Sequence, residues 1–374
     1  MAARPAPPFR ADHVGSLLRP AKLLEARERR KRGEITPEQL KAIEDEAIRD
    51  AVRLQEELGL QAVTDGEFRR TLWHMDFLTS FAGVKSVPGK VKARFHTEAG
   101  EIERTPSALA VTGKLGRPKP IFVEHFKFLK SVATAMPKQT IPSPSIVHFR
   151  GGREAIDKQA YPTLDAFYAD LARVYDEEVR DLAAAGCRYL QIDEVNFAYL
   201  CDPKLREQVK DLGEDPDTLP ATYAKLINSA IAGRPKDMTV CMHLCRGNFE
   251  GAWMAEGGYE PVAEVLFNSI NVHGYFMEYD SDRAGGFEPL RFVPRGHKVV
   301  VLGLVTSKTG ELETKDELKR RIDAAVKYLP LEQLALSPQC GFASTEEGNL
   351  LTEAQQWAKL QLCVDVAREV WGGV

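Results

Sequence analysis

The sequence lacks any apolar run of the roughly 18 residues that a membrane-spanning helix needs. Its first ten residues, MAARPAPPFR, contain no apolar core of the kind found in a secretory signal. Cysteine is scarce, with 6 in 374 residues, which is too few for a disulfide scaffold in a chain of this length. We therefore expect a cytoplasmic protein whose reduced cysteines are available for metal binding or chemistry.

The sequence also lacks a strong excess of charge of either sign. Lys and Arg total 50 and Asp and Glu total 54, for a net charge of −4. No basic face or basic patch with interleaved aromatic residues stands out, so we expect no nucleic-acid partner. The chain shows no solenoid-length repeat and no low-complexity linker. We expect a single domain over residues 1–374.

Short apolar runs rich in strand-forming residues alternate with longer amphipathic segments. The strand-like runs lie at 11–16, 60–68, 139–145, 187–195, 238–245, 269–280, 298–307 and 333–341. The helix-like segments have apolar residues three or four positions apart, as at 35–59, 163–186 and 314–329. This alternation predicts an α/β fold, a parallel (β/α)8 TIM barrel. A doubly wound sheet is the rival fold, but no GxGxxG sequence follows the first strand.

Three segments lie outside the regular alternation. Residues 84–125 alternate poorly and predict an inserted hairpin. The basic segment LLRPAKLLEARERRKRGE predicts a surface helix near the N-terminus. The C-terminal segment 345–371 predicts a helix that closes the barrel or packs in a homo-oligomer, and the sequence leaves these two options open.

Polar residues follow the apolar part of each predicted strand. They are Asp12–His13, Asp65–Glu67, Ser143, Asp193–Glu194, His243–Cys245, Glu278–Asp280, Thr306–Ser307 and Cys340. A parallel barrel brings the carboxyl ends of its strands to one face, where the active sites of such barrels lie. The sequence therefore predicts a polar site at one mouth of the barrel.

The stretch CMHLCRGNF places His243 and Cys245 two residues apart, so both side chains point to the same face of a strand. Nitrogen and sulfur are the ligands that zinc prefers, and Cys340 and Glu278 at other strand ends can complete a tetrahedron. The spacing alone leaves a second interpretation open, in which Cys241, Cys245 and Cys340 are small buried hydrophobic residues.

Taken together, six motifs in order resemble the catalytic half of cobalamin-independent methionine synthase, and more closely the short single-domain relatives of that enzyme. The motifs are DHVGSLLRP, VTDGEFRR, LQIDE, HLC, FMEYD and SPQCGF, and they extend over nearly the whole chain. The resemblance implies a zinc ion and the thiol substrate homocysteine. The implied zinc ligands are His243, Cys245, Glu278 and Cys340. The implied substrate-binding residues are Ser16, Glu67 and Asp193.

The chemistry of homocysteine suits these substrate-binding residues. Its ammonium group can be fixed by the carboxylates of Glu67 and Asp193, and its carboxylate can accept hydrogen bonds from Ser16 and the backbone N–H groups of Val14 to Ser16. In the alternative interpretation, Asp193 and Glu194 orient a neighbouring side chain, as carboxylates near zinc sites commonly do.

The chain departs from the family pattern in three ways that leave the alkyl donor open. It has no second, N-terminal barrel, and no folate-stacking tryptophan follows IPSPS. The proton-donating histidine of the family is replaced by Thr306 in LVTSK, unless His13, His74 or His148 substitutes for it. The donor is therefore a methyl-folate, a methyl-corrinoid or an epoxide.

A site with two thiolates and one carboxylate around zinc is electron-rich and suits sulfur alkylation better than water activation. We therefore predict a zinc-dependent thiol alkyl transferase in which His243, Cys245 and Cys340 carry the chemistry, most simply by methyl transfer to homocysteine to give methionine. The first alternative is the epoxyalkane:coenzyme M transferase activity of the same superfamily, in which Arg69, Arg70 or Arg246 would hold the sulfonate of coenzyme M.

Two further alternatives lie outside thiol alkylation. One is a non-catalytic zinc- and thiol-binding protein, in which four tight protein ligands leave no open position on the metal. The other is a decarboxylase of the uroporphyrinogen type, which needs an arginine-rich mouth and no zinc.

Overall fold

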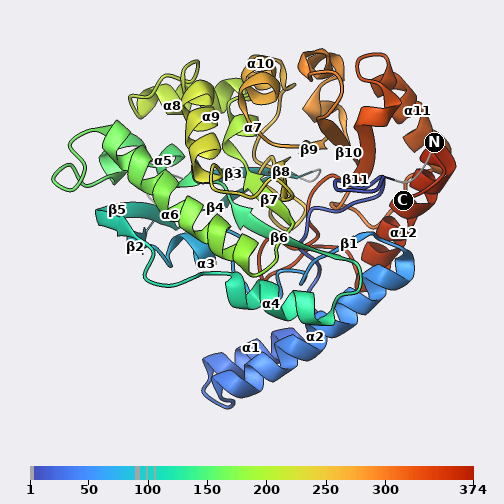
Figure 1. The fold of residues 1–374 in the computed structure, drawn as a ribbon, viewed down its shortest axis with the longest axis horizontal. Coiled ribbons are helices and arrows are strands. Elements are labelled where there is room, and N and C mark those ends of the chain that lie inside the picture. The colour runs from blue at the N-terminus through green and yellow to red at the C-terminus, as the bar shows by residue number, and fades with distance from the viewer. Residues whose placement is uncertain (1–3, 89–92, 98–99, 105–106) are drawn as a thin grey trace.

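The computed structural model describes residues 4–88, 93–97, 100–104 and 107–374 (Figure 1). Its centre is a seven-stranded sheet with the order β1-β6-β7-β8-β9-β10-β11, in which every neighbouring pair is parallel. The strands are β1 (Ala62–Val63), β6 (Met136–Pro142), β7 (Tyr189–Glu194), β8 (Thr239–Leu244), β9 (Gly274–Glu278), β10 (Val299–Val305) and β11 (Leu334–Pro338). Every residue of β7 and β10 is buried, as expected of strands that are covered on both faces.

The first predicted strand, 11–16, is an extended segment that makes only one bridge, between Ala11 and Leu336 of β11. At its other end, the Gly15 carbonyl accepts from the Thr64 hydroxyl at 2.6 Å, just after β1. The segment therefore lies between the two edge strands of the curled sheet. This confirms the predicted TIM-barrel-like architecture, with the difference that a side-chain hydrogen bond replaces part of the backbone ladder at the closing position.

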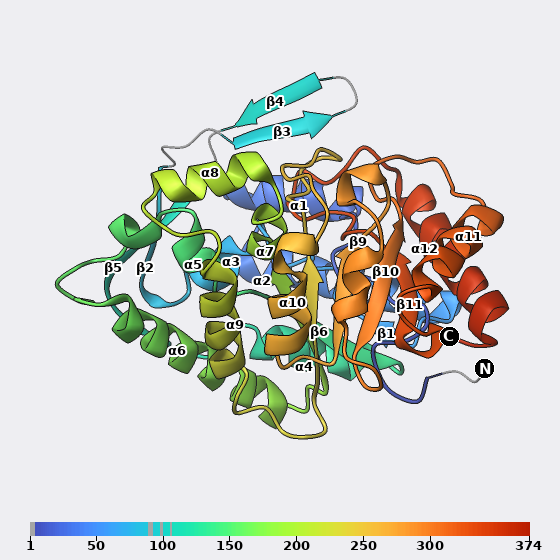
Figure 2. The same cartoon turned by 90° about the horizontal axis from the view of Figure 1, so that it is seen from above.

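Helices follow the strands and lie around the outside of the sheet (Figures 1 and 2). The longer ones are α1 (Ala21–Lys31), α2 (Pro37–Leu58), α4 (Val123–Val132), α6 (Leu164–Ala184), α8 (Pro203–Asp211), α9 (Leu219–Ala230), α10 (Glu260–Ser269), α11 (Lys315–Val326) and α12 (Glu353–Trp371). The short ones are α3 (Met75–Leu78), α5 (Ile146–Phe149), α7 (Asn196–Tyr199) and the 3₁₀ turns Gly152–Ala155, Asp282–Ala284, Glu288–Phe292 and Leu331–Gln333. None of the helices in the described ranges is long and apolar enough to cross a membrane.

Local capping residues set the helix boundaries. Thr36 and Gln39 form a capping box at the start of α2, directly before Pro37. Thr352 and Gln355 form a second capping box at the start of α12. The C-terminal helix therefore begins at Glu353, and its predicted start at residue 345 is wrong because the segment before Thr352 is not helical.

The predicted insertion contains two antiparallel pairs rather than one hairpin. Strand β2 (Ala82–Val87) pairs with β5 (Ala108–Gly116), and β3 (Ala93–Thr97) pairs with β4 (Gly100–Arg104). The remaining parts of this prediction, at 89–92, 98–99 and 105–106, lie outside the described residues. Figure 2 shows β3 and β4 at the edge of the molecule beyond α8. A backbone bridge between His96 and Trp253 joins this hairpin to the loop after β8.

Candidate functional site

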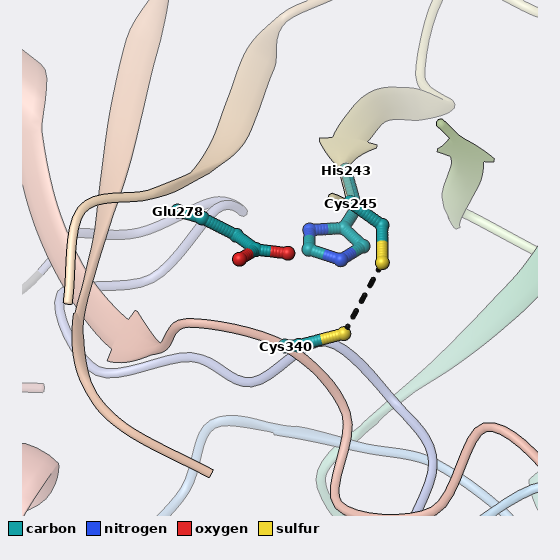
Figure 3. Close-up of side chains that lie close together, drawn as sticks. All are labelled: His243, Cys245, Glu278 and Cys340. Atoms are coloured by element: carbon teal, nitrogen blue, oxygen red, sulfur yellow. Dashed lines mark hydrogen bonds between the residues drawn. The ribbon is translucent and has the colours of Figure 1, made fainter. Parts of the chain in front are cut away.

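Four side chains with metal-ligating atoms converge at the carboxyl ends of three strands (Figure 3). His243 lies in β8 and Cys245 directly follows it, Glu278 is the last residue of β9, and Cys340 comes shortly after β11. One ligand atom from each lies within 4.8 Å of the others, and all four residues are buried. The structure thus brings together the four residues that the sequence predicts as a metal site.

The histidine of this cluster is oriented by the neighbouring strand. His243 Nδ1 lies 3.3 Å from the Phe276 carbonyl oxygen, which makes Nδ1 the protonated donor. His243 Nε2 is buried and has no hydrogen-bond partner among the described residues. A metal-bound histidine commonly donates its other ring N–H to a carbonyl in this way, so Nε2 presents a lone pair suited to a metal.

The other ligand atoms are also held in place. Glu278 Oε1 accepts from the Arg246 backbone N–H at 2.8 Å, whereas Oε2 is buried and has no hydrogen-bond partner within the described ranges. Cys245 Sγ accepts from the Gly247 N–H at 3.3 Å and lies 3.5 Å from Cys340 Sγ. One nitrogen, one oxygen and two sulfurs form a donor set that fits tetrahedral zinc.

The charges in this cluster depend strongly on one another. Hydrogen bonding to Cys340 holds the pKa of the Cys245 thiol well below its ordinary value, and the same bond raises the pKa of Cys340 well above it. Burial opposes the charged imidazole of His243, but the negative charges of the nearby Cys245 thiolate, Asp193 and Glu278 outweigh burial and raise its pKa. Burial raises the pKa of Glu278. A bound dication would let both thiols and the carboxylate ionise together.

A cavity of about 1360 Å³ opens onto this cluster. Its lining includes His243, Cys245 and Cys340 together with the three predicted substrate residues Ser16, Glu67 and Asp193. Aromatic side chains also line the cavity, and these are Trp73, Phe95, Phe149, Tyr199 and Phe249. The cavity is therefore large enough for two substrates, with thiol-binding chemistry at its floor and apolar walls above.

The two acidic residues predicted to bind substrate, Glu67 and Asp193, have different surroundings. Glu67 has a positive φ of 62°, an uncommon conformation for a residue other than glycine that clusters at functional sites. Its Oε1 accepts from Thr140 Oγ1 at 2.7 Å and lies 3.2 Å from Arg70 Nη1. Burial and the charge of Glu67 raise the pKa of Asp193 to about 7, and Gln191 Nε2 donates to Asp193 Oδ1 at 2.6 Å.

The structure places several other candidate residues away from this cavity. Glu194 is buried and accepts hydrogen bonds from Ser145 Oγ and the Asn196 N–H. Arg69 pairs with Glu44 and Asp45 on α2. The cavity lining contains none of the three arginines considered for a sulfonate, which are Arg69, Arg70 and Arg246.

Most of the candidate proton donors also lie away from the cavity or cannot donate a proton near pH 7. His13 and His148 do not line the cavity within the described part of the chain. His74 does line it, but burial lowers the pKa of His74 to about 3, so this imidazole is neutral near pH 7. Thr306 donates its hydroxyl to Asp280 Oδ2 at 3.0 Å and faces a neighbouring loop.

Sequence reasoning missed the cationic residues behind Glu278. Arg283 Nη2 lies 3.9 Å and Lys308 Nζ lies 4.0 Å from Glu278 Oε2. Arg283 lies in the 3₁₀ turn after β9 and Lys308 lies on the loop after β10. A basic residue is common in such connections and carries no distinctive sequence signal. Their proximity to Glu278 emerges only when β9 and β10 are placed side by side.

Comparisons with known proteins agree with this geometry. Residues 9–369 match the family described as the cobalamin-independent synthase catalytic domain. The uncharacterized protein YxjH of Bacillus subtilis is 49% identical over 365 residues, which cover 97% of this chain and 95% of YxjH.

Two solved structures are similar over nearly their full length. A Listeria monocytogenes protein, provisionally assigned as a vitamin-B12-independent methionine synthase, is 41% identical with a TM-score of 0.77 and 98% coverage of both chains. A B12-independent methionine synthase from Shewanella sp. W3-18-1, solved with selenomethionine, shares the fold with a TM-score of 0.73, 23% identity and coverage of 97% and 98%. The chain therefore belongs to the cobalamin-independent methionine synthase family, a family of methyltransferases.

Proposed function

We propose that this protein is a zinc-dependent thiol alkyl transferase that methylates homocysteine to methionine. The observation that carries the proposal is the shared cavity, in which the candidate zinc ligands His243, Cys245 and Cys340 face the same space as Glu67 and Asp193. Homocysteine has a thiol and an ammonium group, and one molecule can reach both sets of residues only if they line one cavity. The Shewanella protein holds selenomethionine, which supports an amino acid of this shape as the ligand.

Each residue has a defined task in this proposal. His243, Cys245, Glu278 and Cys340 would hold the zinc ion, which when bound lowers the pKa of the substrate thiol so that it reacts as a thiolate. Glu67 and Asp193 would hold the substrate ammonium, and Ser16 would donate to its carboxylate. The four ligand residues are buried at the floor of the cavity, so the reacting sulfur would lie away from the protein surface.

The alkyl donor would occupy the apolar part of the cavity, between the substrate residues and the β3–β4 hairpin. A methyl-folate or a methyl-corrinoid would supply the methyl group, whereas an epoxide belongs to the alternative with coenzyme M. We also propose that the chain acts as one barrel domain in the cytoplasm, where its cysteines stay reduced.

The alternatives receive less support from the geometry. Coenzyme M carries a sulfonate, and the three arginines expected to bind it lie outside the cavity lining, so only a different arginine, Arg150, faces the cavity among the described residues. A purely structural zinc clamp would not need a large cavity that opens directly onto three of its four ligands.

Zinc-edge X-ray absorption on the zinc-loaded protein, with homocysteine and coenzyme M compared side by side, tests the proposal. We expect homocysteine to replace an oxygen ligand of zinc with sulfur. Entry of coenzyme M alone would favour epoxide chemistry, and entry of neither thiol would contradict thiol activation at this site.

A further inference from the structure

Lys308 is a buried cation without a hydrogen-bond partner for its ammonium group among the described residues. Its side chain is only 7% exposed, and Nζ makes no hydrogen bond within the described ranges. Buried charges in proteins are normally paired and hydrogen-bonded, because burying an unpaired charge is strongly unfavourable. The position of Lys308 therefore calls for a functional explanation.

The nearby acid that would most simply pair with Lys308 is already occupied. Asp280 Oδ1 accepts from Arg283 Nη2 at 2.6 Å, and Asp280 Oδ2 accepts from Thr306 Oγ1 at 3.0 Å. Thr306, at the position that matches the family's histidine, thus occupies one carboxylate oxygen of Asp280. The carboxylate left for Lys308 is that of Glu278, whose Oε2 also has no hydrogen-bond partner in the described part of the chain.

The distance between these two groups is informative. Lys308 Nζ and Glu278 Oε2 lie 4.0 Å apart, which is too far for a hydrogen bond but close enough for strong attraction at a buried site. Glu278 also contributes one carboxylate oxygen to the ligand cluster with His243, Cys245 and Cys340. A shift of roughly 1 Å would give the N–O distance of a normal hydrogen bond.

We propose that Lys308 is a positioning residue that receives the Glu278 carboxylate when the acceptor thiol takes its place on the metal. The identity of the thiol rests on the function proposed above, whereas the relation between Lys308 and Glu278 does not. An incoming thiolate adds negative charge to a site that already has two thiolates and a carboxylate. The Glu278 carboxylate can move away from the metal at low cost only if a buried cation pairs with it in its new position. Lys308 lies where it can provide that cation.

Zinc affinity without any thiol gives the first test. We expect Lys308→Met to bind zinc at least about tenfold more tightly in competition with a chromophoric chelator at fixed pH, because a cation that attracts Glu278 is removed. Lys308→Arg should restore an affinity near that of the wild type. The matched control is Lys298→Met at the other end of β10, where Nζ is held by the carbonyls of Phe267 and Ile270. This control should leave zinc affinity unchanged.

A double-mutant cycle separates positioning from a general effect of charge. If Lys308 acts through Glu278, the effect of Lys308→Met on zinc affinity should be smaller by at least about threefold in a Glu278→Ala background. Additive effects of the two substitutions, or equal zinc affinities of wild type and Lys308→Met, would overturn the proposal. Lys308→Gln provides a second variant if thermal unfolding shows that Lys308→Met does not fold.

Titration with homocysteine tests the role of Lys308 when the substrate thiol binds. Zinc-edge absorption should show that Lys308→Met needs about tenfold more homocysteine than wild type to replace oxygen with sulfur. If wild-type zinc takes up no homocysteine, the proposed function is wrong, and the zinc-affinity cycle still decides the role of Lys308. If wild type and Lys308→Met take up homocysteine equally, the positioning role is wrong.

Discussion

Cys245 Sγ and Cys340 Sγ lie 3.5 Å apart although 95 positions separate the two residues in the chain. The parallel order of β8, β9, β10 and β11 brings them together, because each strand ends at the same mouth of the barrel. Two thiols at this distance, with one pKa lowered and the other raised, act as one acid-base unit. Zinc affinity and zinc-dependent stability should therefore both depend on these two cysteines.

Replacement of Cys340 by serine should weaken zinc binding by at least about 100-fold, because loss of even a supporting residue near a metal commonly costs 10- to 100-fold. Chelator competition measures this change. Cys363→Ser is the matched control, since Cys363 is also buried but lies on α12 outside the ligand cluster. Equal zinc affinities of Cys340→Ser and Cys363→Ser would contradict the assignment of Cys340 as a ligand.

Chelation of zinc should lower the thermal stability of the protein. A ligand present at 100 times its dissociation constant stabilises the native state by about 2.7 kcal/mol, and its removal reverses this effect. The measurement is the unfolding midpoint with and without a strong chelator. The variant Cys245→Ser/Cys340→Ser should show no chelator-dependent shift, and a shift of wild-type size in that variant would place the metal elsewhere.

Amino-acid binding should strengthen as pH rises through about 7, because the pKa of Asp193 is raised to about 7 by burial and by Glu67. Below this pH Asp193 is protonated and neutral, and above it the carboxylate can pair with a substrate ammonium. Methionine is the suitable probe, since it has no thiol and its amino group keeps its charge over this range. Calorimetric titration of methionine between pH 6 and pH 8, roughly one unit to either side of the pKa, measures the effect.

Asp193→Asn supplies the control for this pH dependence. It should bind methionine about tenfold more weakly at high pH, as expected when a hydrogen bond to a charged group is lost. Its affinity should also be nearly independent of pH in this range. A pH dependence in Asp193→Asn equal to that of wild type would show that another group is titrating.

Much of the barrel could be predicted from the sequence, because strands buried on both faces read as apolar runs that end in polar residues. The predicted runs 187–195 and 298–307 contain β7 and β10, which are buried throughout. The insertion was less predictable, because its sequence alternates weakly and two antiparallel pairs give the same pattern as one hairpin. The start of the C-terminal helix was missed because Thr352, rather than the apolar pattern, fixes it.

The candidate site shows the same limit of sequence reasoning. His243 and Cys245 carry a local signal, since a spacing of two on a strand puts them on one face. Their proximity to Cys340 follows only from the barrel. Lys308 carries no local sequence signal. It is singled out by the hydrogen bonds that Asp280 already accepts and by Glu278 Oε2, which has no hydrogen-bond partner among the described residues.

The barrel interior contains a buried ion pair whose disruption should destabilise the fold. Lys138 Nζ lies 3.1 Å from Asp12 Oδ1, and both side chains are fully buried. Asp12 also accepts from the Tyr189 hydroxyl at 2.8 Å, so the pair belongs to a hydrogen-bonded network. We expect Lys138→Met to lower the free energy of unfolding by about 3–5 kcal/mol, because it leaves the Asp12 carboxylate buried without its cation.

Denaturant unfolding of the metal-free protein measures this loss without a contribution from zinc. The double variant Asp12→Asn/Lys138→Met should recover part of the lost stability, since it removes the stranded charge as well as its partner. Lys359→Met provides a comparison with a buried ion pair outside the barrel interior. Lys359 is buried, but it pairs with Glu313 near the surface of the barrel. If Lys138→Met were as stable as wild type, the ion pair would contribute nothing to the stability of the fold.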